Sequence, residues 1–152
     1  ATAAGCQLVA SCDLAVAGKA AKFATPGVNI GLFCSTPMVA LSRNIARKHA
    51  MRMLLTGDAI DADTAWQMGL VSDVATDDDL ITATDDLATR IAERSAMTVK
   101  LGKEAFYRQL EMPLSGAYDY ASGVMTNNMQ KHDAREGIGA FVEKRHPDWR
   151  HE

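Results

Sequence analysis

Hydrophobic residues recur at every third or fourth position through the second half of the chain, which is the spacing of one face of an α-helix. Leu80, Leu87 and Ile91 keep this spacing, and Pro113 interrupts the pattern. A proline inside a helix removes a hydrogen bond and clashes with the preceding turn, so we expect separate helices on its two sides. The pattern predicts that residues 77–152 are almost entirely helical.

The first half of the chain carries shorter apolar runs that are separated by Gly, Pro and Asp. Runs of this length between turn-forming residues indicate short helices and short strands. We expect helices over 3–11, from Pro37 to Leu55 with a break near Asn44, and from Asp61 or Asp63 to Gly69. We expect strands over 13–17, 21–24 and 70–74.

Residues that prefer helix ends refine these boundaries. Gly57 suits the position just after a helix, where a left-handed backbone is common, and Asp133 suits the cap at the start of the last helix. The acidic run at 77–79 is expected in the first turn of a helix that ends near Arg94. Acidic residues at the start and basic residues at the end complement the helix dipole.

The composition is that of an ordinary globular domain, and it argues against several classes of function. The chain has 152 residues, of which 47% are hydrophobic and 23% are charged, and its net charge is −3. This length suits one domain, and without a basic excess no nucleic-acid partner is expected. No apolar run approaches the roughly 20 residues of a membrane helix. We therefore expect neither a membrane span nor a signal segment.

Cys6, Cys12 and Cys34 stand among apolar or small residues. An odd number of cysteines in such surroundings favours buried, reduced thiols over a disulfide or a metal site. The histidines show no ligand spacing, so no metal site is expected. These features predict a reducing, cytoplasmic compartment, or a mitochondrial one if the source is eukaryotic.

The most informative stretch is residues 3–31, which read AAGCQLVASCDLAVAGKAAKFATPGVNIG. Downstream stand MRMLLTG at 51–57, DTAWQMGLV at 63–71 and EGIGAFVEKRHPDW at 136–149. In this order, over essentially the whole chain, these motifs resemble the crotonase superfamily, the enoyl-CoA hydratase/isomerase proteins. The resemblance implies an acyl-CoA thioester as the substrate, no cofactor beyond its coenzyme A, and lyase or isomerase chemistry in fatty acid metabolism.

The resemblance also implies an α/β fold, the ββα spiral of the crotonase (ClpP-like) proteins. Residues 1–76 would form the end of the spiral core, and residues 77–152 would form a helical region for oligomerisation into a homotrimer or homohexamer. The chain would correspond to the C-terminal half of a family member. It could be a fragment of a longer protein, with sheet surface exposed that the first half normally covers.

The family holds the thioester carbonyl oxygen between two backbone N–H groups, which stabilise the enolate that forms there. By resemblance, one donor is the amide of Ala4, at a helix start where free N–H groups favour negative charge. Gly5 has no Cβ and lets the backbone approach the ligand. The second donor would lie outside this chain. The alternative to an oxyanion site at Ala4 is that this stretch is an ordinary helix start packed with small residues.

Two positions depart from the family pattern. The positions that carry the catalytic glutamates of two-glutamate hydratases are Gln7 and Gly27 here. Such a hydratase needs both carboxylates to activate water and deliver a proton. A glutamine can only orient a water molecule, and a glycine cannot do even that. Because no Asp or Glu lies between Asp13 and Asp58, hydration by an ordinary carboxylate pair is not expected.

Three further residues are candidates for ligand contact. Cys34 lies on the loop that borders the acyl pocket in relatives, but a nucleophile there needs a base, and no histidine is close in sequence. Phe141 and Lys144 match the aromatic residue and the lysine with which relatives contact the coenzyme A of a neighbouring subunit. A lysine can follow a mobile phosphate. The alternative is a solvated basic face with Phe141 in the core.

The sequence thus predicts an acyl-CoA-binding protein of the enoyl-CoA hydratase/isomerase family that is not a two-glutamate hydratase. Three alternatives remain open. The first is an active enzyme whose acid and base lie outside this chain, and the second is a catalytically inactive binding or regulatory homologue. The third is a fragment that is stable only as an oligomer, through its helices.

Overall fold

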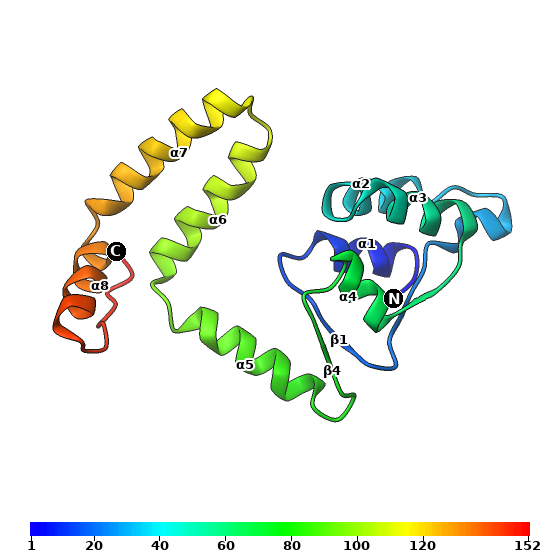
Figure 1. Cartoon of the computed structure of the whole chain (residues 1–152), viewed down its shortest axis with the longest axis horizontal. Coiled ribbons are helices and arrows are strands. Elements are labelled where there is room, and N and C mark those ends of the chain that lie inside the picture. The colour runs from blue at the N-terminus through cyan, green and yellow to red at the C-terminus, as the bar shows by residue number, and fades with distance from the viewer. The chain divides into compact units, whose positions relative to one another are not determined.

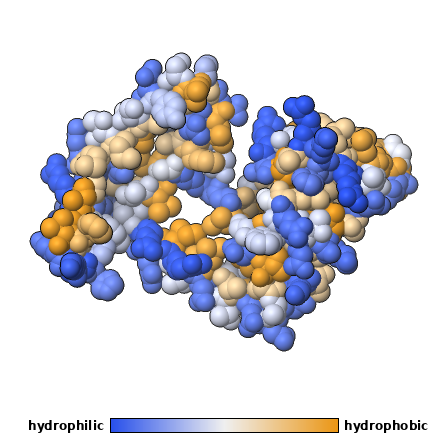
Figure 2. Space-filling view, viewed as in Figure 1, coloured by the Kyte–Doolittle hydropathy of each residue, from blue (hydrophilic) through white to orange (hydrophobic).

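The structure is a computed structural model that describes all 152 residues. The chain forms two compact units, Ala1–Asp86 and Leu87–Glu152, and helix α5 (Leu80–Ala92) spans the boundary between them (Figure 1). Hydrophobic side chains remain on the surface of both units (Figure 2). None of the helices is long and apolar enough to cross a membrane.

The first unit combines short helices with short strands, as its short apolar runs predict; the 3-10 helix and the strand β3 are additional to the prediction. Its helices are α1 (Ala4–Ser11), η1 (Pro26–Ile30, a 3-10 helix), α2 (Ser35–Asn44), α3 (Arg47–Thr56) and α4 (Ala62–Met68). Strand β1 (Val16–Gly18) pairs in parallel with β4 (Asp73–Ala75), and β2 (Lys22–Phe23) pairs antiparallel with β3 (Ile60–Asp61). A parallel bridge between Thr2 and Ala24 joins the residues before α1 to the end of β2.

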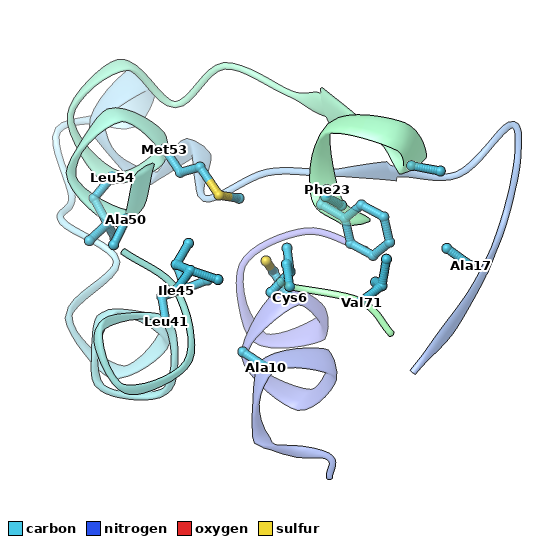
Figure 3. Packing of buried hydrophobic residues seen from close by; sticks show 13 residues of the cluster. Cys6, Ala10, Ala17, Phe23, Leu41, Ile45, Ala50, Met53, Leu54 and Val71 are labelled. Carbon is cyan, nitrogen blue, oxygen red and sulfur yellow. The ribbon is translucent and has the colours of Figure 1, made fainter. Parts of the chain in front are cut away.

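The core of the first unit lies between its helices (Figure 3). Cys6 of α1 and Leu41 of α2 are fully buried, and Met53 and Leu54 of α3 are only 1% exposed. A large side chain in such a place contributes through both burial and tight packing, so truncating Leu41 to Ala would cost about 2–5 kcal/mol. This packing of α1 on α2 fixes the start of α1, where the candidate oxyanion donor lies.

Hydrogen bonds at the helix ends confirm several predicted boundaries. The Asn44 side chain donates to the carbonyl oxygens of Ala10 (2.7 Å) and Ala40 (2.8 Å), which ends α2 at the predicted break and ties it to α1. Gly57 follows α3 with φ +68°. Asp61 caps α4 by accepting from Thr64 N (2.8 Å). The hydrogen bonds from the Thr64 side chain and backbone lower the pKa of the Asp61 carboxyl.

The two parallel strands lie later in the chain than the hydrophobic runs predict. Residues 13–17 and 70–74 are the expected strands, whereas the ladder starts at Val16 and Asp73. For β4 the reason lies in the end of α4, because Leu70 N–H donates to Ala65 O (2.8 Å). That amide closes the helix and is not available for sheet pairing.

The second unit is helical up to Glu143, with a non-helical C-terminal tail, which confirms the prediction of an almost entirely helical second half. After α5 come α6 (Ala96–Leu110), α7 (Leu114–Met129) and α8 (His132–Glu143). Helices α6 and α7 pack against each other on the two sides of the turn at Pro113. Ser95 caps α6, since its hydroxyl accepts from Thr98 N (3.2 Å).

Two predicted helix starts in this half are wrong. Helix α5 begins at Leu80, after the acidic run, because the Asp77 carboxylate accepts instead from Ala20 N (3.2 Å). Helix α8 begins at His132, with Asp133 inside its first turn rather than at the cap. The carboxylate of Asp133 is only 1% exposed and binds backbone amides of the C-terminal tail.

The cysteines do not share one environment. Cys6 is buried, Cys34 is half-buried and Cys12 is exposed just after the end of α1. The expectation of buried thiols is therefore wrong for Cys12. Burial raises the pKa of the Cys6 thiol; the N-terminal ammonium group opposes this shift, and Cys34 adds to it.

Candidate functional site

The start of α1 has an unusual backbone. Ala3, at the cap position, has φ +46° and ψ −112°, a conformation that costs an alanine on the order of 1–3 kcal/mol. Neighbouring hydrogen bonds hold it there: Ala3 N–H donates to Ala24 O (2.9 Å), and Ala24 N–H donates to Ala1 O (3.1 Å). Strain that the surrounding structure maintains in this way is common at ligand sites.

This geometry leaves the amide of Ala4 free. Gly5 N–H donates to Thr2 O (2.8 Å) and Gln7 N–H donates to Ala3 O (3.0 Å), whereas Ala4 N–H has no acceptor in the chain. Ala4 and Gly5 are exposed. A free N–H at the start of a helix suits a negatively charged oxygen, through both its hydrogen bond and the helix dipole. An oxyanion could therefore be bound at this point.

Gln7 lies three residues after Ala4 on α1, and residues at this spacing share one face of a helix. Its side chain is half-buried, and its amide pairs with no group of the chain. Its backbone oxygen accepts from Ser11 Oγ (2.8 Å). The side-chain amide is thus available to orient a polar group beside the Ala4 amide, but it cannot take up a proton at neutral pH.

Gly27 lies inside η1, in a place that has no room for a side chain. A Cβ added there would lie 2.8 Å from Leu32 O and 2.9 Å from Cys34 Sγ. The loop is closed by a hydrogen bond from Leu32 N–H to Gly27 O (2.9 Å). Because one of the two obstacles is backbone, any side chain at residue 27 requires the loop to move.

The chain brings these residues into one region. The bond between Ala3 and Ala24 holds the start of α1 against the end of β2, and Gly27 follows Ala24 by only three residues, which span at most about 11 Å. Cys34 is the cap residue of α2, which packs on α1. Gly27 therefore lies within a short stretch of chain from the start of α1.

Phe141 and Lys144 lie in the second unit, at the C-terminal end of α8. Phe141 is 84% exposed, so the alternative that places it in the core is wrong. Lys144 is exposed and has φ +55°, and its N–H donates to Phe141 O (3.3 Å). Both side chains are free to contact a ligand or another subunit.

Asp133, on α8, binds the C-terminal tail of the second unit. Its carboxylate accepts from the backbone amides of Arg150 and His151, both at 2.9 Å. Burial raises the pKa of this carboxyl, but the hydrogen bonds from Ser95, Arg150, His132 and His151 outweigh burial and lower the pKa to about 2. These bonds fasten the tail to α8, which is a structural role.

Glu136 fastens the same tail one turn further along α8. It pairs with Arg145, with an Nη2–Oε2 distance of 2.9 Å, and accepts from Asp148 N (2.8 Å). The hydrogen bonds from Arg145 and Asp148 lower the pKa of the Glu136 carboxyl to about 2. No group of three or more His, Cys, Asp or Glu side chains is arranged to hold a metal ion.

Two features of this region are not visible in the sequence pattern. The first is the strained backbone of Ala3, since a positive φ is usually signalled by Gly, Asn or Asp. The second is the contact that Cys34 and the Leu32 carbonyl would make with a side chain at Gly27. This contact depends on how the loop closes, which no local pattern reveals.

Comparison with known proteins shows which family these residues belong to. The sequence profile of the enoyl-CoA hydratase/isomerase family matches residues 1–152. Enoyl-CoA hydratase domain-containing protein 3, mitochondrial, is 52% identical in Xenopus laevis, over 99% of this chain and 51% of that protein. The human protein of the same name is 52% identical over 100% of this chain and 50% of its own length.

Solved structures agree with the sequence comparison. An enoyl-CoA hydratase from Mycobacterium smegmatis, 50% identical, superposes with a TM-score of 0.96 over 98% of this chain and 58% of that chain. Human enoyl-CoA hydratase domain-containing protein 3 is 52% identical and superposes with a TM-score of 0.95, over 98% of this chain and 59% of that chain. The chain spans about half the length of the curated relatives, and it matches the C-terminal portion of the crotonase fold. The chain belongs to the enoyl-CoA hydratase/isomerase family.

Proposed function

We propose that this chain contributes one wall of an acyl-CoA binding pocket, in which the amide of Ala4 holds the thioester carbonyl oxygen. The observation that carries the proposal is the unpaired Ala4 N–H at the start of α1. Such a donor stabilises the negative charge that develops on the oxygen when the neighbouring α-carbon loses a proton. Membership of a family that acts on acyl-CoA thioesters supports this ligand.

The proposed reaction is not hydration by a carboxylate pair. Gln7 offers an amide beside the oxyanion donor, and Gly27 sits in a loop without room for a side chain. An acid or base for another reaction would come from a segment outside this chain. The second candidate is a catalytically inactive acyl-CoA-binding or regulatory homologue, and the closed loop at Gly27 favours it.

We infer that Phe141 and Lys144 contact the coenzyme A that is bound by a neighbouring subunit. Both are exposed at the end of α8, where an aromatic ring and an ammonium group can take the adenine and a phosphate of coenzyme A. The same exposed helices suit self-association, which is the proposed role of residues 77–152. Residues 1–76 would then form the core that carries the thioester site.

The relatives named above as enoyl-CoA hydratase domain-containing protein 3 are described as mitochondrial. We therefore propose a mitochondrial location if the source is eukaryotic and a cytoplasmic location if it is bacterial. The exposed thiol of Cys12 fits either compartment, because both keep cysteines reduced.

The test is calorimetric titration with an acyl-CoA of a full-length protein, meaning one that also carries the half seen in the relatives. Ala4→Pro removes the N–H donor, so binding should be lost. Because the residue before a proline prefers extended backbone and Ala3 has φ +46°, circular dichroism is needed to show that this variant keeps its fold. Ala4→Gly keeps the amide and should bind like the parent. Lys144→Ala should weaken binding less, since an exposed charge contact is worth at most about 1 kcal/mol. A folded Ala4→Pro variant with parental affinity would show that the helix start is merely structural.

A further inference from the structure

Lys144 follows α8 with a backbone conformation that is unfavourable for a lysine. It has φ +55° and ψ 40°, in the left-handed region, where helices commonly place a glycine because a Cβ comes too close to the next carbonyl oxygen. A residue that is strained in this way persists only when its surroundings hold it, and such residues cluster at ligand sites. The residues around Lys144 must therefore hold the end of α8 in place.

Arg145 provides this support through both its backbone and its side chain. Its N–H donates to Ala140 O (3.0 Å), which closes the last turn of α8. Its guanidinium donates to Glu136 through Nη1 (2.5 Å) and Nη2 (2.9 Å), and to Glu143 through Nε (2.6 Å). A guanidinium that is bound along two edges has a fixed orientation. Arg145 thus ties the end of the helix to the preceding turns.

This interaction differs from an ordinary ion pair on the surface. The Glu136 side chain is only 17% exposed, and it also accepts from Asp148 N (2.8 Å). Exposed ion pairs contribute little unless their geometry is bidentate or several charges form a network. Because both conditions hold for Arg145, its ion pairs can maintain the strained backbone of Lys144.

Arg145 also leaves the ammonium group of Lys144 without a partner. Glu143 directly precedes Lys144 in the chain, but its carboxylate binds Arg145. The Lys144 ammonium forms no ion pair within the chain. A free ammonium group attracts a phosphate, which an unpaired carboxylate beside it would repel. Pairing Glu143 with Arg145 therefore favours an anionic ligand at Lys144.

We propose that Arg145 is a positioning residue for coenzyme A, which holds Lys144 in its strained conformation and keeps Glu143 away from it. The inference rests on the proposed function, in which Phe141 and Lys144 contact the coenzyme A of a neighbouring subunit. Phe141 lies three residues before Lys144, a spacing that places both on one face of the helix end. Arg145 acts through these two residues and needs no contact with the ligand.

The test compares two ligands that differ only in the phosphorylated nucleotide. Butyryl-CoA carries it, butyryl-pantetheine lacks it, and calorimetry measures the affinity of the full-length protein for each. Arg145→Gln should weaken binding of butyryl-CoA about tenfold, within the range of an aromatic stacking contact together with a phosphate contact. Binding of butyryl-pantetheine should not change. The matched control is Arg108→Gln, which breaks an exposed pair with Glu104 (3.2 Å) and should change neither affinity.

The ratio of the two affinities separates the possible outcomes. A merely structural role of Arg145 would weaken both ligands alike or neither of them. If the parent prefers butyryl-CoA and Arg145→Gln keeps the same ratio, the inference is overturned while the proposed function stands. If the parent binds neither ligand, or binds both equally well, it is the proposed function that falls, and the inference falls with it.

A second comparison tests whether Arg145 acts through Lys144. In a Lys144→Ala background, Arg145→Gln should lower the affinity for butyryl-CoA only about twofold, because the residue that it positions is gone. A tenfold loss in both backgrounds would contradict the inference. Circular dichroism and light scattering show whether each variant keeps the fold and the mass of the parent. If Arg145→Gln does not fold, Glu136→Gln takes its place in both comparisons, with the same expected outcomes.

Discussion

At the scale of single residues, the candidate site depends on backbone conformation as much as on side chains. Ala3 contributes no functional group, yet its backbone, with φ +46° and ψ −112°, precedes the unpaired amide of Ala4. The expectation that Gln7 and Gly27 stand where two-glutamate hydratases carry carboxylates needs the sequence alone, because it depends only on residue type and order. The conformation of Ala3 cannot be predicted, because alanine does not signal a positive φ. It follows from the pairing of Ala3 with Ala24, a contact between distant parts of the chain.

At this scale we predict that the full-length protein hydrates crotonyl-CoA far more slowly than a two-glutamate hydratase. Positioned acid and base groups are worth roughly 10²–10⁴-fold, and Gln7 and Gly27 supply neither. Gln7→Glu restores one carboxylate but not its partner, so it should not recover an ordinary rate. Gln7→Asn is the matched control, and the loss of enoyl absorbance measures both. A parent rate like that of ordinary hydratases would indicate an acid outside this chain.

Helix boundaries in this chain are largely predictable, whereas strand boundaries are not. Gly57, Asp61 and Asn44 act at helix ends through local hydrogen bonds, which depend on residues a few positions away. The short strands depend on partners that are distant in sequence, so the hydrophobic runs alone do not set their register. Among the helix ends, the prediction that Asp133 caps the last helix is wrong. Asp133 has the residue type of a cap, but its carboxylate binds the C-terminal tail instead.

The attachment of the tail to α8 should depend on pH. The pKa of Asp133 in the folded chain is about 2, below the value of about 3.9 for an unfolded chain. The carboxylate therefore stabilises the fold at pH above about 4, and this contribution is lost as the pH falls through about 2. Asp133→Asn should lower the thermal midpoint at pH 7 on the order of 5 °C, and the difference from the parent should shrink toward pH 2.

Thermal unfolding followed by circular dichroism at several pH values measures this difference. The same change at Asp119, which is exposed on α7, serves as the control and should leave the midpoint in place. If the difference in thermal midpoint between the parent and Asp133→Asn stays constant down to pH 2, the charge of Asp133 does not hold the tail.

At the scale of the whole molecule, the chain divides into Ala1–Asp86, which carries the candidate thioester site, and Leu87–Glu152, which is helical. The ordered motifs predict the family, because they run through both units and the family profile covers all of them. Composition and periodicity alone predict only a globular chain with a helical second half. The division into units depends on which helices pack together, and that information is spread over many small contacts.

We predict that the chain self-associates, as a homotrimer or homohexamer. The second unit exposes several large apolar side chains, including Leu114 (76%), Phe141 (84%) and Val142 (73%), and burying such groups drives association. Light scattering at micromolar concentration measures the mass. Phe141→Glu should shift it toward the monomer, whereas His49→Glu, on the exposed face of α3, should not. A single species of 16.4 kDa in the parent would contradict the prediction.

The closed loop at Gly27 also has a consequence for descent within the family. A lineage that has lost its second carboxylate could regain it by one substitution only if the loop accepted a side chain. Here the first Cβ already meets Leu32 O and Cys34 Sγ, so a glutamate must arrive together with a replaced thiol and a reshaped loop. A return to a glutamate at residue 27 would therefore need several coordinated changes rather than one.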